Sequence, residues 1–345
     1  MLLKKRQIGQ TDLHVTELGF GAATLGNLYR RMTDENAQAA IEKALELGLN
    51  QFDTAPYYGF GLSERRVGDA LREVNPNDFI VSTKVGRILK PCAQAEDKYG
   101  FCSPMPFEPE YDYSYDGIMR SFEHSLQRLG LSKIDILYMH DIGRATHGDD
   151  HDRLFKIAME GGYKAMDELR SQGLVSAIGL GVNEYEVCEQ AMEHGQFDCF
   201  LLAGRYTLLE QKALESFLPR CLKENTSIVL GGPYNSGILA TGTRRAGVEP
   251  YYNYEPASAS IISTVAKIED ICEQFNIPLA AAALQFPLAH PAVVSVIPGL
   301  SSAGRVESTV QQMQLQIPAE FWQCLQSAGL LYPDVPVPAT EQVAV

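Results

Sequence analysis

Short apolar runs alternate along the chain with longer segments in which apolar residues recur every three or four positions. The longer segments are typical of amphipathic helices, whereas the short runs are typical of buried strands. The strand-like runs are residues 18–21, 51–53, 80–84, 134–140, 177–180, 199–203, 228–231 and 293–297. The helix-like segments are residues 36–47, 64–71, 118–129, 163–170, 184–192, 211–222 and 261–275. This alternation predicts an α/β protein, a closed (β/α)8 TIM barrel.

Glycines at the ends of the helix-like segments support these boundaries. Gly48, Gly130 and Gly173 each stand just past a helical run, where a C-terminal cap favours glycine. A doubly wound open sheet, the rival fold, usually carries G-x-G-x-x-G after its first strand, and the chain reads GFGAAT at residues 19–24. We therefore expect a single barrel domain over residues 1–345, which binds any dinucleotide by other means.

Four segments fall outside the alternation. Residues 2–17 contain two short apolar–polar alternations around a turn signal, which predict a β-hairpin before the barrel. Residues 87–116 and 232–256 follow the third and seventh strands and are rich in Gly, Pro and aromatic residues. Long ordered loops of this kind usually form lids or substrate walls. The tail, residues 333–345, is expected to be extended and poorly ordered.

Composition narrows the class of partner. The formal net charge is −14, with 29 basic and 43 acidic residues, which argues against a nucleic-acid or anionic-membrane surface. The seven cysteines are scattered and form no C-x-x-C pair, so we expect reduced thiols in the cytoplasm. Neither a signal peptide nor a transmembrane segment is predicted. A small molecule is the expected partner, and the oligomeric state cannot be inferred.

Polar residues end three consecutive predicted strands. Asp53 ends the second, Lys84 the third and His140 the fourth, and Tyr58 follows Asp53 on a short loop. Each residue alone has an ordinary structural explanation, such as a helix cap, a solvated lysine or a core histidine. In a barrel, however, the C-terminal ends of all strands converge at one face, so these four groups are expected to lie together.

At this point the chain resembles the aldo-keto reductase family. The matching segments are LGFGAATLG (18–26), FDTAPYYG (52–59), LSERRVGDAL (62–71), STKVG (82–86), RLGLSKIDILYMHD (128–141), residues 177–183 and VIPG (296–299). The resemblance implies that Tyr58 transfers a proton, that Lys84 and Asp53 lower its pKa, and that His140 orients the reacting oxygen. A nearby ammonium favours a phenolate, so this assignment is also chemically sound.

The resemblance also implies a nicotinamide cofactor, because no side chain supplies a hydride. The implied cofactor-binding residues are Gly21, Asp53, Asn183, Gly231, Gly232, Pro233, Asn235, Gly237, Gly299, Ser301 and Arg305. Residues 231–237 correspond to the loop that covers the pyrophosphate. Members that prefer NADP commonly place Lys or Arg directly after the eighth strand, where this chain has GLSS at residues 299–302. Only Arg305, one helical turn further on, offers a cation. We therefore expect NAD rather than NADP.

Within the family, PFEPEYDYSYDGIMRS (106–121), LLAGRYTLLEQ (201–211) and GGPYNSGILATG (231–242) resemble the D-threo-aldose (L-fucose, L-galactose) dehydrogenases and the pyridoxal 4-dehydrogenases. The expected activity is NAD-dependent oxidation of an aldose C1 hemiacetal to a lactone, with pyridoxal oxidation as the alternative. A non-catalytic, cofactor-binding regulatory barrel is a further alternative. Residues 147–152, although rich in His and Asp, are expected to form a solvated polar loop without a metal. Arg205 is expected to make a structural ion pair.

Overall fold

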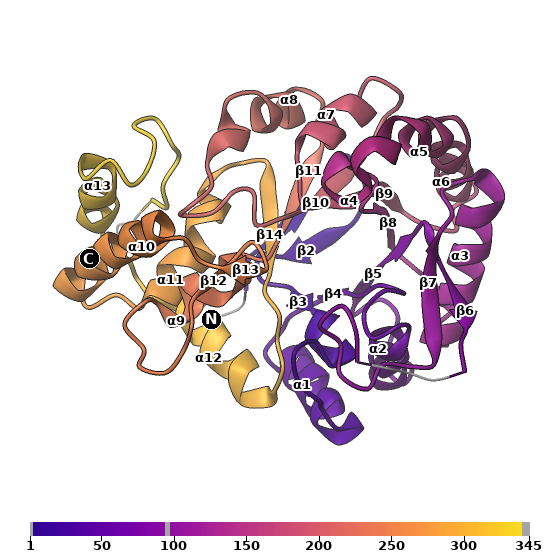
Figure 1. Ribbon diagram of the computed structural model, residues 1–345, viewed down its shortest axis with the longest axis horizontal. Coiled ribbons are helices and arrows are strands. Elements are labelled where there is room, and N and C mark those ends of the chain that lie inside the picture. The colour runs from indigo at the N-terminus through magenta and orange to yellow at the C-terminus, as the bar shows by residue number, and fades with distance from the viewer. Residues whose placement is uncertain (1–2, 94–96, 340–345) are drawn as a thin grey trace.

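The computed structural model describes residues 3–93 and 97–339. Its main sheet holds eight parallel strands in the order β14-β11-β10-β9-β8-β5-β4-β3, ringed by helices (Figure 1). The strands are β3 (Phe20–Gly21), β4 (Gln51–Asp53), β5 (Ile80–Val85), β8 (Ile136–His140), β9 (Ala177–Val182), β10 (Cys199–Ala203), β11 (Ser227–Gly231) and β14 (Val293–Ile297). The predicted strands and the (β/α)8 fold are confirmed.

The first and last strands meet and close the sheet into a barrel. Leu18 pairs with Val296 and Gly21 with Gly299 in isolated parallel bridges. Gly21 donates its backbone N–H to the Pro298 carbonyl at 3.0 Å, and a Cβ at this position would lie 2.8 Å from the same oxygen. Only glycine allows the two backbones to approach so closely, which gives Gly21 a structural role at the seam.

Side chains alternate between the inside and the outside of the barrel, as the two-residue period of a strand requires. On β8, Ile136 and Tyr138 belong to the inner cluster, whereas Leu137 and Met139 pack against the surrounding helices. The predicted N-terminal hairpin is present as β1 (Lys5–Gln7) and β2 (His14–Thr16), which pair antiparallel. Val15 on β2 joins the inner cluster, so the hairpin helps to fill that end of the barrel.

The predicted helices are present, with one later start. They are α1 (Asp34–Glu46), α2 (Leu62–Leu71), α3 (Tyr115–Leu129), α6 (Tyr163–Ser171), α7 (Glu186–Ala191), α8 (Phe217–Lys223) and α10 (Ala259–Phe275). The α-helix expected over 211–222 begins only at Phe217, because the ring of Pro219 clashes with a continuing helix before it. Gly48, Gly130 and Gly173 all have positive φ, as predicted for helix ends.

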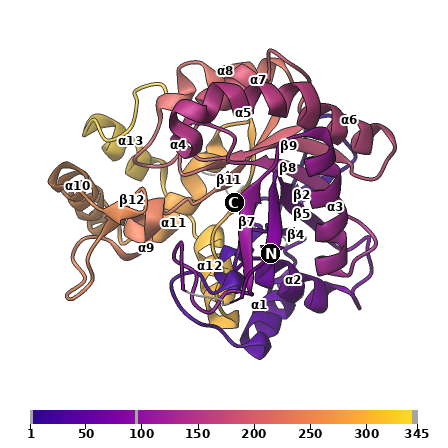
Figure 2. The same cartoon turned by 45° about the vertical axis from the view of Figure 1, so that its right-hand side comes forward.

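Further helices were not predicted. They are α4 (Arg144–His147), α5 (His151–Ile157), α9 (Ile238–Thr241), α11 (Leu279–Gln285), α12 (Ala303–Gln314) and α13 (Ala319–Ser327). Both ribbon views place α10 and α13 on the side of the barrel away from α3 and α6 (Figures 1 and 2). Within the described ranges, no helix is long and apolar enough to cross a membrane.

Both long loops contain a small antiparallel hairpin. The loop after β5 forms β6 (Arg87–Pro91) paired with β7 (Phe107–Tyr111), and the loop after β11 forms β12 (Tyr251–Tyr252) paired with β13 (Glu255–Pro256). The tail differs from the expectation over its described part, since Val335 is 4% exposed and packs with the core. Residues 340–345 of the tail lie outside the described residues.

Candidate active site

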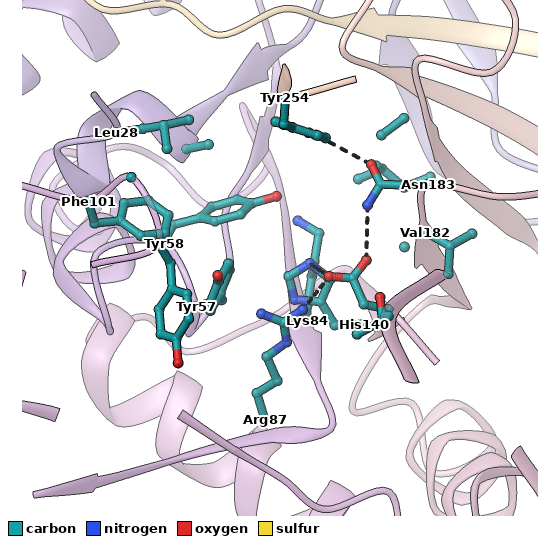
Figure 3. A pocket seen from close by; sticks show the side chains of 18 of the residues that line it. Leu28, Tyr57, Tyr58, Lys84, Arg87, Phe101, His140, Val182, Asn183 and Tyr254 are labelled. Atoms are coloured by element: carbon teal, nitrogen blue, oxygen red, sulfur yellow. Dashed lines mark hydrogen bonds and ion pairs between the residues drawn. The ribbon is translucent and has the colours of Figure 1, made fainter. Parts of the chain in front are cut away.

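The four polar residues singled out in the sequence lie at one mouth of the barrel. Asp53 ends β4, Lys84 lies near the end of β5 and His140 ends β8, while Tyr58 lies on the loop between β4 and α2. Tyr58, Lys84 and His140 line a pocket of about 560 Å³ (Figure 3). Asp53 lies behind Lys84, so the structure brings all four residues together.

Asp53 and Lys84 form a buried ion pair. The Lys84 Nζ donates to Asp53 Oδ2 at 2.7 Å and to the Thr54 carbonyl at 2.9 Å, and Ser82 Oγ donates to Asp53 Oδ1 at 2.7 Å. The side chains of Lys84 and Asp53 are 1% and 3% exposed. A buried charge is tolerated only when it is paired and hydrogen bonded, and both conditions are met here. The Lys84 ammonium is thus fixed in position and charge.

Tyr58 lies against this ammonium on one side and His140 on the other. The Lys84 Nζ is 4.6 Å from the centroid of the Tyr58 ring. The rings of Tyr58 and His140 have centroids 6.0 Å apart and are nearly perpendicular, at 89°. His140 Nδ1 is buried without a hydrogen-bond partner in the described chain, and its Nε2 lies 3.5 Å from Asp141 Oδ2. A phenol and an imidazole therefore face one small volume from two sides.

Burial dominates the protonation of these groups. It lowers the pKa of His140 well below its ordinary value, and the charges of Arg87 and Lys84 lower it further, so the imidazole is neutral. Burial raises the pKa of Tyr58, and Lys84 opposes this rise without cancelling it. Burial alone would lower the pKa of Lys84, but Asp53 and Tyr58 raise it, so the ammonium persists. Lys84 thus favours the phenolate as expected, yet the phenol remains protonated near neutral pH in the unliganded protein.

A turn that depends on glycine positions Tyr58. Gly59 has φ +64°, and a Cβ there would lie 2.4 Å from the Gly26 carbonyl oxygen. The Tyr58 N–H donates to the Ala55 carbonyl, and its carbonyl accepts from the Ser63 N–H at the start of α2. The loop is thereby fixed at both ends, and Tyr58 within it is held against Lys84.

Aromatic side chains from the first long loop form one wall of the pocket. Tyr99, Phe101 and Tyr111 line it, as expected for three of the aromatics in residues 87–116. The loop is attached to the segment after β3, since the Tyr29 N–H donates to the Gly100 carbonyl at 2.7 Å and Leu28 bridges Phe101. The wall is therefore built by two segments far apart in the sequence, which pattern analysis could not have paired.

Arg87 and Asp141 are pocket residues that the sequence analysis missed as a pair. Arg87 is 5% exposed and forms an ion pair with Asp141, which follows His140 directly. The Arg87 guanidinium carbon lies 3.9 Å from the ring centroid of Tyr57 and 5.0 Å from that of Tyr111. Figure 3 shows the guanidinium between Tyr57 and the carboxylate that also approaches Asn183. The position of Asp141 beside a strand-end histidine was the one available sequence signal.

Among the expected cofactor residues, Asn183 lines the pocket from the loop after β9. Its side chain makes two long contacts, from Nδ2 to Asp141 Oδ1 at 3.4 Å and from Oδ1 to the Tyr254 hydroxyl at 3.3 Å. Arg205 donates to the Asn183 carbonyl and to Asn253 Oδ1, and among the described residues it makes no ion pair. The expectation of a structural ion pair for Arg205 was therefore wrong; it joins two loops by hydrogen bonds.

The loop after β11 contains two glycines with positive φ, and the side chain of its asparagine is hydrogen bonded within the protein. Gly232 and Gly237 have φ of +57° and +100°, and Pro233 between them is buried. Asn235 is buried, donates to the Gly204 carbonyl at 3.1 Å and accepts from Thr207 Oγ1 at 2.6 Å. Gly231 packs against Leu201. Asn235 thus joins two barrel loops, and the N–H groups of Asn235 and Gly237 donate to the Gly232 and Tyr234 carbonyls at 3.1 Å and 3.0 Å.

The segment after β14 is contacted by a second cation, which the sequence did not indicate. Gly299 lies against Thr24, and Ser302 caps α12 by accepting from the Arg305 N–H at 3.2 Å. The exposed Arg30, from the loop after β3, donates to Ser301 Oγ at 2.8 Å. Arg30 and Arg305 therefore both lie near the start of α12, a helix N-terminus of the kind that favours anions.

The His- and Asp-rich segment is not the solvated loop that was expected. Residues 144–162 form consecutive short helical turns that lead into α6. His151 is buried, with Nδ1 3.1 Å from the Ile142 carbonyl, and His147 Nε2 lies 3.0 Å from the Tyr113 hydroxyl. Over residues 3–93 and 97–339, no cluster of three or more metal-ligating side chains is found. His151 is buried and His147 half-buried, which the local pattern did not indicate, and residues 148–150 and 152 are exposed as expected although the segment is helical.

Comparisons with known proteins find similarity along most of the chain. The Aldo/keto reductase family model matches residues 17–329. Pyridoxal 4-dehydrogenase from Microbacterium luteolum is 43% identical over 95% of this chain and 98% of its own, and D-threo-aldose 1-dehydrogenase from a Pseudomonas species is 36% identical over 92% and 95%. The structure of an aldo-keto reductase from Bacillus halodurans (holo form) has a TM-score of 0.73 and 29% identity over 99% of both chains.

Proposed function

We propose a reaction for this chain from the premise that it belongs to the aldo/keto reductase family and is an oxidoreductase. The proposed reaction is NAD-dependent oxidation of a cyclic hemiacetal carbon to a lactone. The observation that carries it is the buried Asp53–Lys84 pair, whose ammonium lies 4.6 Å from the Tyr58 ring inside the pocket. This arrangement matches the need of the reaction for a base that removes a hydroxyl proton.

The proposed roles follow from the contacts. Tyr58, as phenolate, accepts the hydroxyl proton of the hemiacetal while the hydride leaves the same carbon. Lys84 stabilises that phenolate, and Asp53 holds the ammonium in place through its 2.7 Å bond. His140 lines the pocket and is neutral, so its imidazole can hydrogen bond to the reacting oxygen without repelling a positive cofactor. The aromatic wall excludes water from the reacting atoms.

A nicotinamide cofactor fits the residues present, and family members use such cofactors. The Asn183 side chain has only two long contacts, which a carboxamide can replace. The positive-φ backbone at Gly232 and Gly237 and the capped start of α12 suit phosphates. Bound NAD would accept the hydride, and its positive nicotinamide ring would further favour the Tyr58 phenolate. We propose NAD because no cation directly follows β14, although Arg30 lies close by.

An aldose is the first candidate substrate. Its ring hydroxyls suit a pocket that combines tyrosine faces with polar side chains, and a relative named D-threo-aldose 1-dehydrogenase is 36% identical. Pyridoxal is the second candidate, favoured by the 43% identity to a pyridoxal 4-dehydrogenase. Both compounds form cyclic hemiacetals whose oxidation yields a lactone, so one catalytic apparatus serves either.

The direct test is NADH formation, followed by absorbance, with L-fucose, L-galactose, D-arabinose and pyridoxal. Turnover of at least one compound with NAD is expected, and a tenfold advantage for NADP would overturn the cofactor assignment. In that event, Arg30→Ala should lower the kcat/KM for NADP selectively. Tight NAD binding without turnover of any of these compounds would favour a regulatory barrel instead.

A further inference from the structure

The ion pair between Arg87 and Asp141 lies inside the pocket, next to the residue that meets the reacting oxygen. Asp141 Oδ2 pairs with Arg87 and lies 3.5 Å from His140 Nε2, and Asp141 Oδ1 lies 3.4 Å from Asn183 Nδ2. The pair thus connects the expected catalytic histidine to the expected cofactor contact. Because the desolvation of a buried ion pair can cost more than its attraction returns, stability alone does not explain a charged pair at this place.

Tight turns hold both charged residues in place. Asp141 has φ +51°, a conformation that side chains rarely adopt, and its N–H donates to the Gly181 carbonyl at 2.9 Å. Gly86, with φ +93°, bends the chain between β5 and β6 and lies against the Tyr113 ring. Arg87 therefore turns back to the barrel mouth instead of following the hairpin outward. Strained residues of this kind are concentrated at functional sites.

The Arg87 guanidinium is oriented but incompletely bonded. Tyr57 and Tyr111 contact it through their ring faces, at 3.9 Å and 5.0 Å, which fixes its plane. One terminal nitrogen pairs with Asp141, while the buried Nε has no hydrogen-bond partner among the described residues. A buried N–H without a partner carries a penalty, and the guanidinium that carries it lines the pocket in which a substrate oxygen would lie.

We propose that Arg87 and Asp141 recognise the oxygen substituent that neighbours the reacting hemiacetal carbon. Arg87 donates a hydrogen bond to that oxygen, and Asp141 accepts a hydrogen bond from it when it is a hydroxyl. His140 Nε2 and Asp141 Oδ2 lie 3.5 Å apart, a spacing similar to that between oxygens on neighbouring carbons of a sugar. In an aldose the recognised group is the 2-hydroxyl, and in pyridoxal it is the phenolic oxygen, which is attached one ring carbon further from the hemiacetal carbon. This inference rests on the proposed hemiacetal oxidation.

The test pairs each substrate with an analogue that lacks the neighbouring oxygen, a 2-deoxy aldose or 3-deoxypyridoxal. The wild-type protein should prefer the complete substrate in kcat/KM by about 10- to 100-fold, the range expected for a charge-assisted hydrogen bond. The Arg87→Met variant should have a lower kcat/KM for the complete substrate and an unchanged kcat/KM for the analogue. The preference should then fall to about threefold or less. The Arg87→Lys variant should retain only part of the preference for the complete substrate, because lysine lacks the planar fork of the guanidinium.

Arg170→Met provides the matched control. Arg170 on α6 pairs with Asp198, which immediately precedes β10 and so lies at the opposite end of the barrel. Its loss should leave the substrate preference unchanged. If Arg87→Met does not fold, Asp141→Asn, which conserves side-chain size, should lower the same preference.

Two negative results have different meanings. An equal loss on substrate and analogue would show that Arg87 acts on the fold alone and would overturn the inference, while the hemiacetal oxidation would stand. Absence of wild-type activity with every hemiacetal tested would overturn the proposed function and the inference with it.

Discussion

Replacing Lys84 with methionine should slow substrate oxidation by two to three powers of ten. Methionine conserves the length of the side chain and removes the charge that lies 4.6 Å from the Tyr58 ring centroid. With an effective dielectric constant of about 20, a unit charge at this distance stabilises a phenolate by about 4 kcal/mol. Because each tenfold change in rate corresponds to about 1.4 kcal/mol, the loss in kcat is expected to be about 100- to 1,000-fold.

The pH dependence separates this electrostatic effect from a loss of structure. Oxidation requires the phenolate, so kcat should rise with pH in the wild-type protein, and loss of Lys84 raises the pKa of Tyr58. The rise should therefore move to higher pH in the variant. Steady-state NADH formation over a pH series measures both quantities. A loss below tenfold, or a large loss without displacement of the profile, would refute the electrostatic role of Lys84.

Asp53 requires its own control, because the single variant leaves a carboxylate buried without its ammonium. Its pKa then rises, so the folded state binds a proton more tightly than the unfolded state, and stability falls as pH increases. The double variant Lys84→Met/Asp53→Asn removes both charges and keeps an acceptor for the Ser82 hydroxyl. Thermal denaturation should show recovered stability at high pH, with kcat still low. Recovery of kcat would mean that Lys84 matters only as a partner of Asp53.

Three further substitutions test separate parts of the structure. Tyr58→Phe should lower kcat by orders of magnitude and leave NAD affinity, measured by fluorescence quenching, within about threefold; retention of most activity would exclude Tyr58 as the acid–base group. Gly59→Ala should lower both kcat and melting temperature, because the new Cβ would lie 2.4 Å from the Gly26 carbonyl oxygen. Burial lowers the pKa of His290 to about 4, so the unfolded state binds the extra proton and stability should fall by up to about 3 kcal/mol between pH 6.5 and 4. His290→Asn should flatten that part of the pH–stability curve in urea titrations, and an unchanged slope would contradict the assignment.

The strands and the four strand-associated polar residues could be predicted because both depend on local sequence. A short apolar run that ends in a polar residue fixes where the strand stops and on which edge the polar group lies, as for Asp53 and His140. One unpredicted helix, α11, was missed for an equally local reason. Helix α11 contains four alanines, and Ala280–Leu284 is buried throughout, so no polar face produces a helical period.

The pocket walls could not be predicted, because their positions depend on contacts between distant loops. Tyr254 reaches Asn183 only because the β12–β13 hairpin folds back over the mouth, where the Tyr254 N–H donates to Ser236 Oγ at 2.8 Å. Arg30 reaches Ser301 across 271 positions of sequence. Neither contact leaves a periodic or compositional signal, and each bears on the choice of ligand. Sequence patterns therefore indicated the residues proposed for proton transfer better than the loop residues that shape the ligand pocket.

Backbone strain in the pocket is found in residues of the loops and not in the polar residues of the strands. Tyr29, Asp141 and Tyr254, which all line the pocket, have positive φ although none is glycine. Such conformations cost about 1–3 kcal/mol each and persist only where surrounding contacts enforce them. Asp53 and Lys84, by contrast, lie in regular strands. The Asp53–Lys84 pair thus lies at positions that the barrel fixes without strain, whereas residues proposed to select substrate and cofactor lie at strained loop positions that a few changed contacts can alter. Relatives with the same four residues and different loops would then be expected to retain the chemistry and differ in substrate.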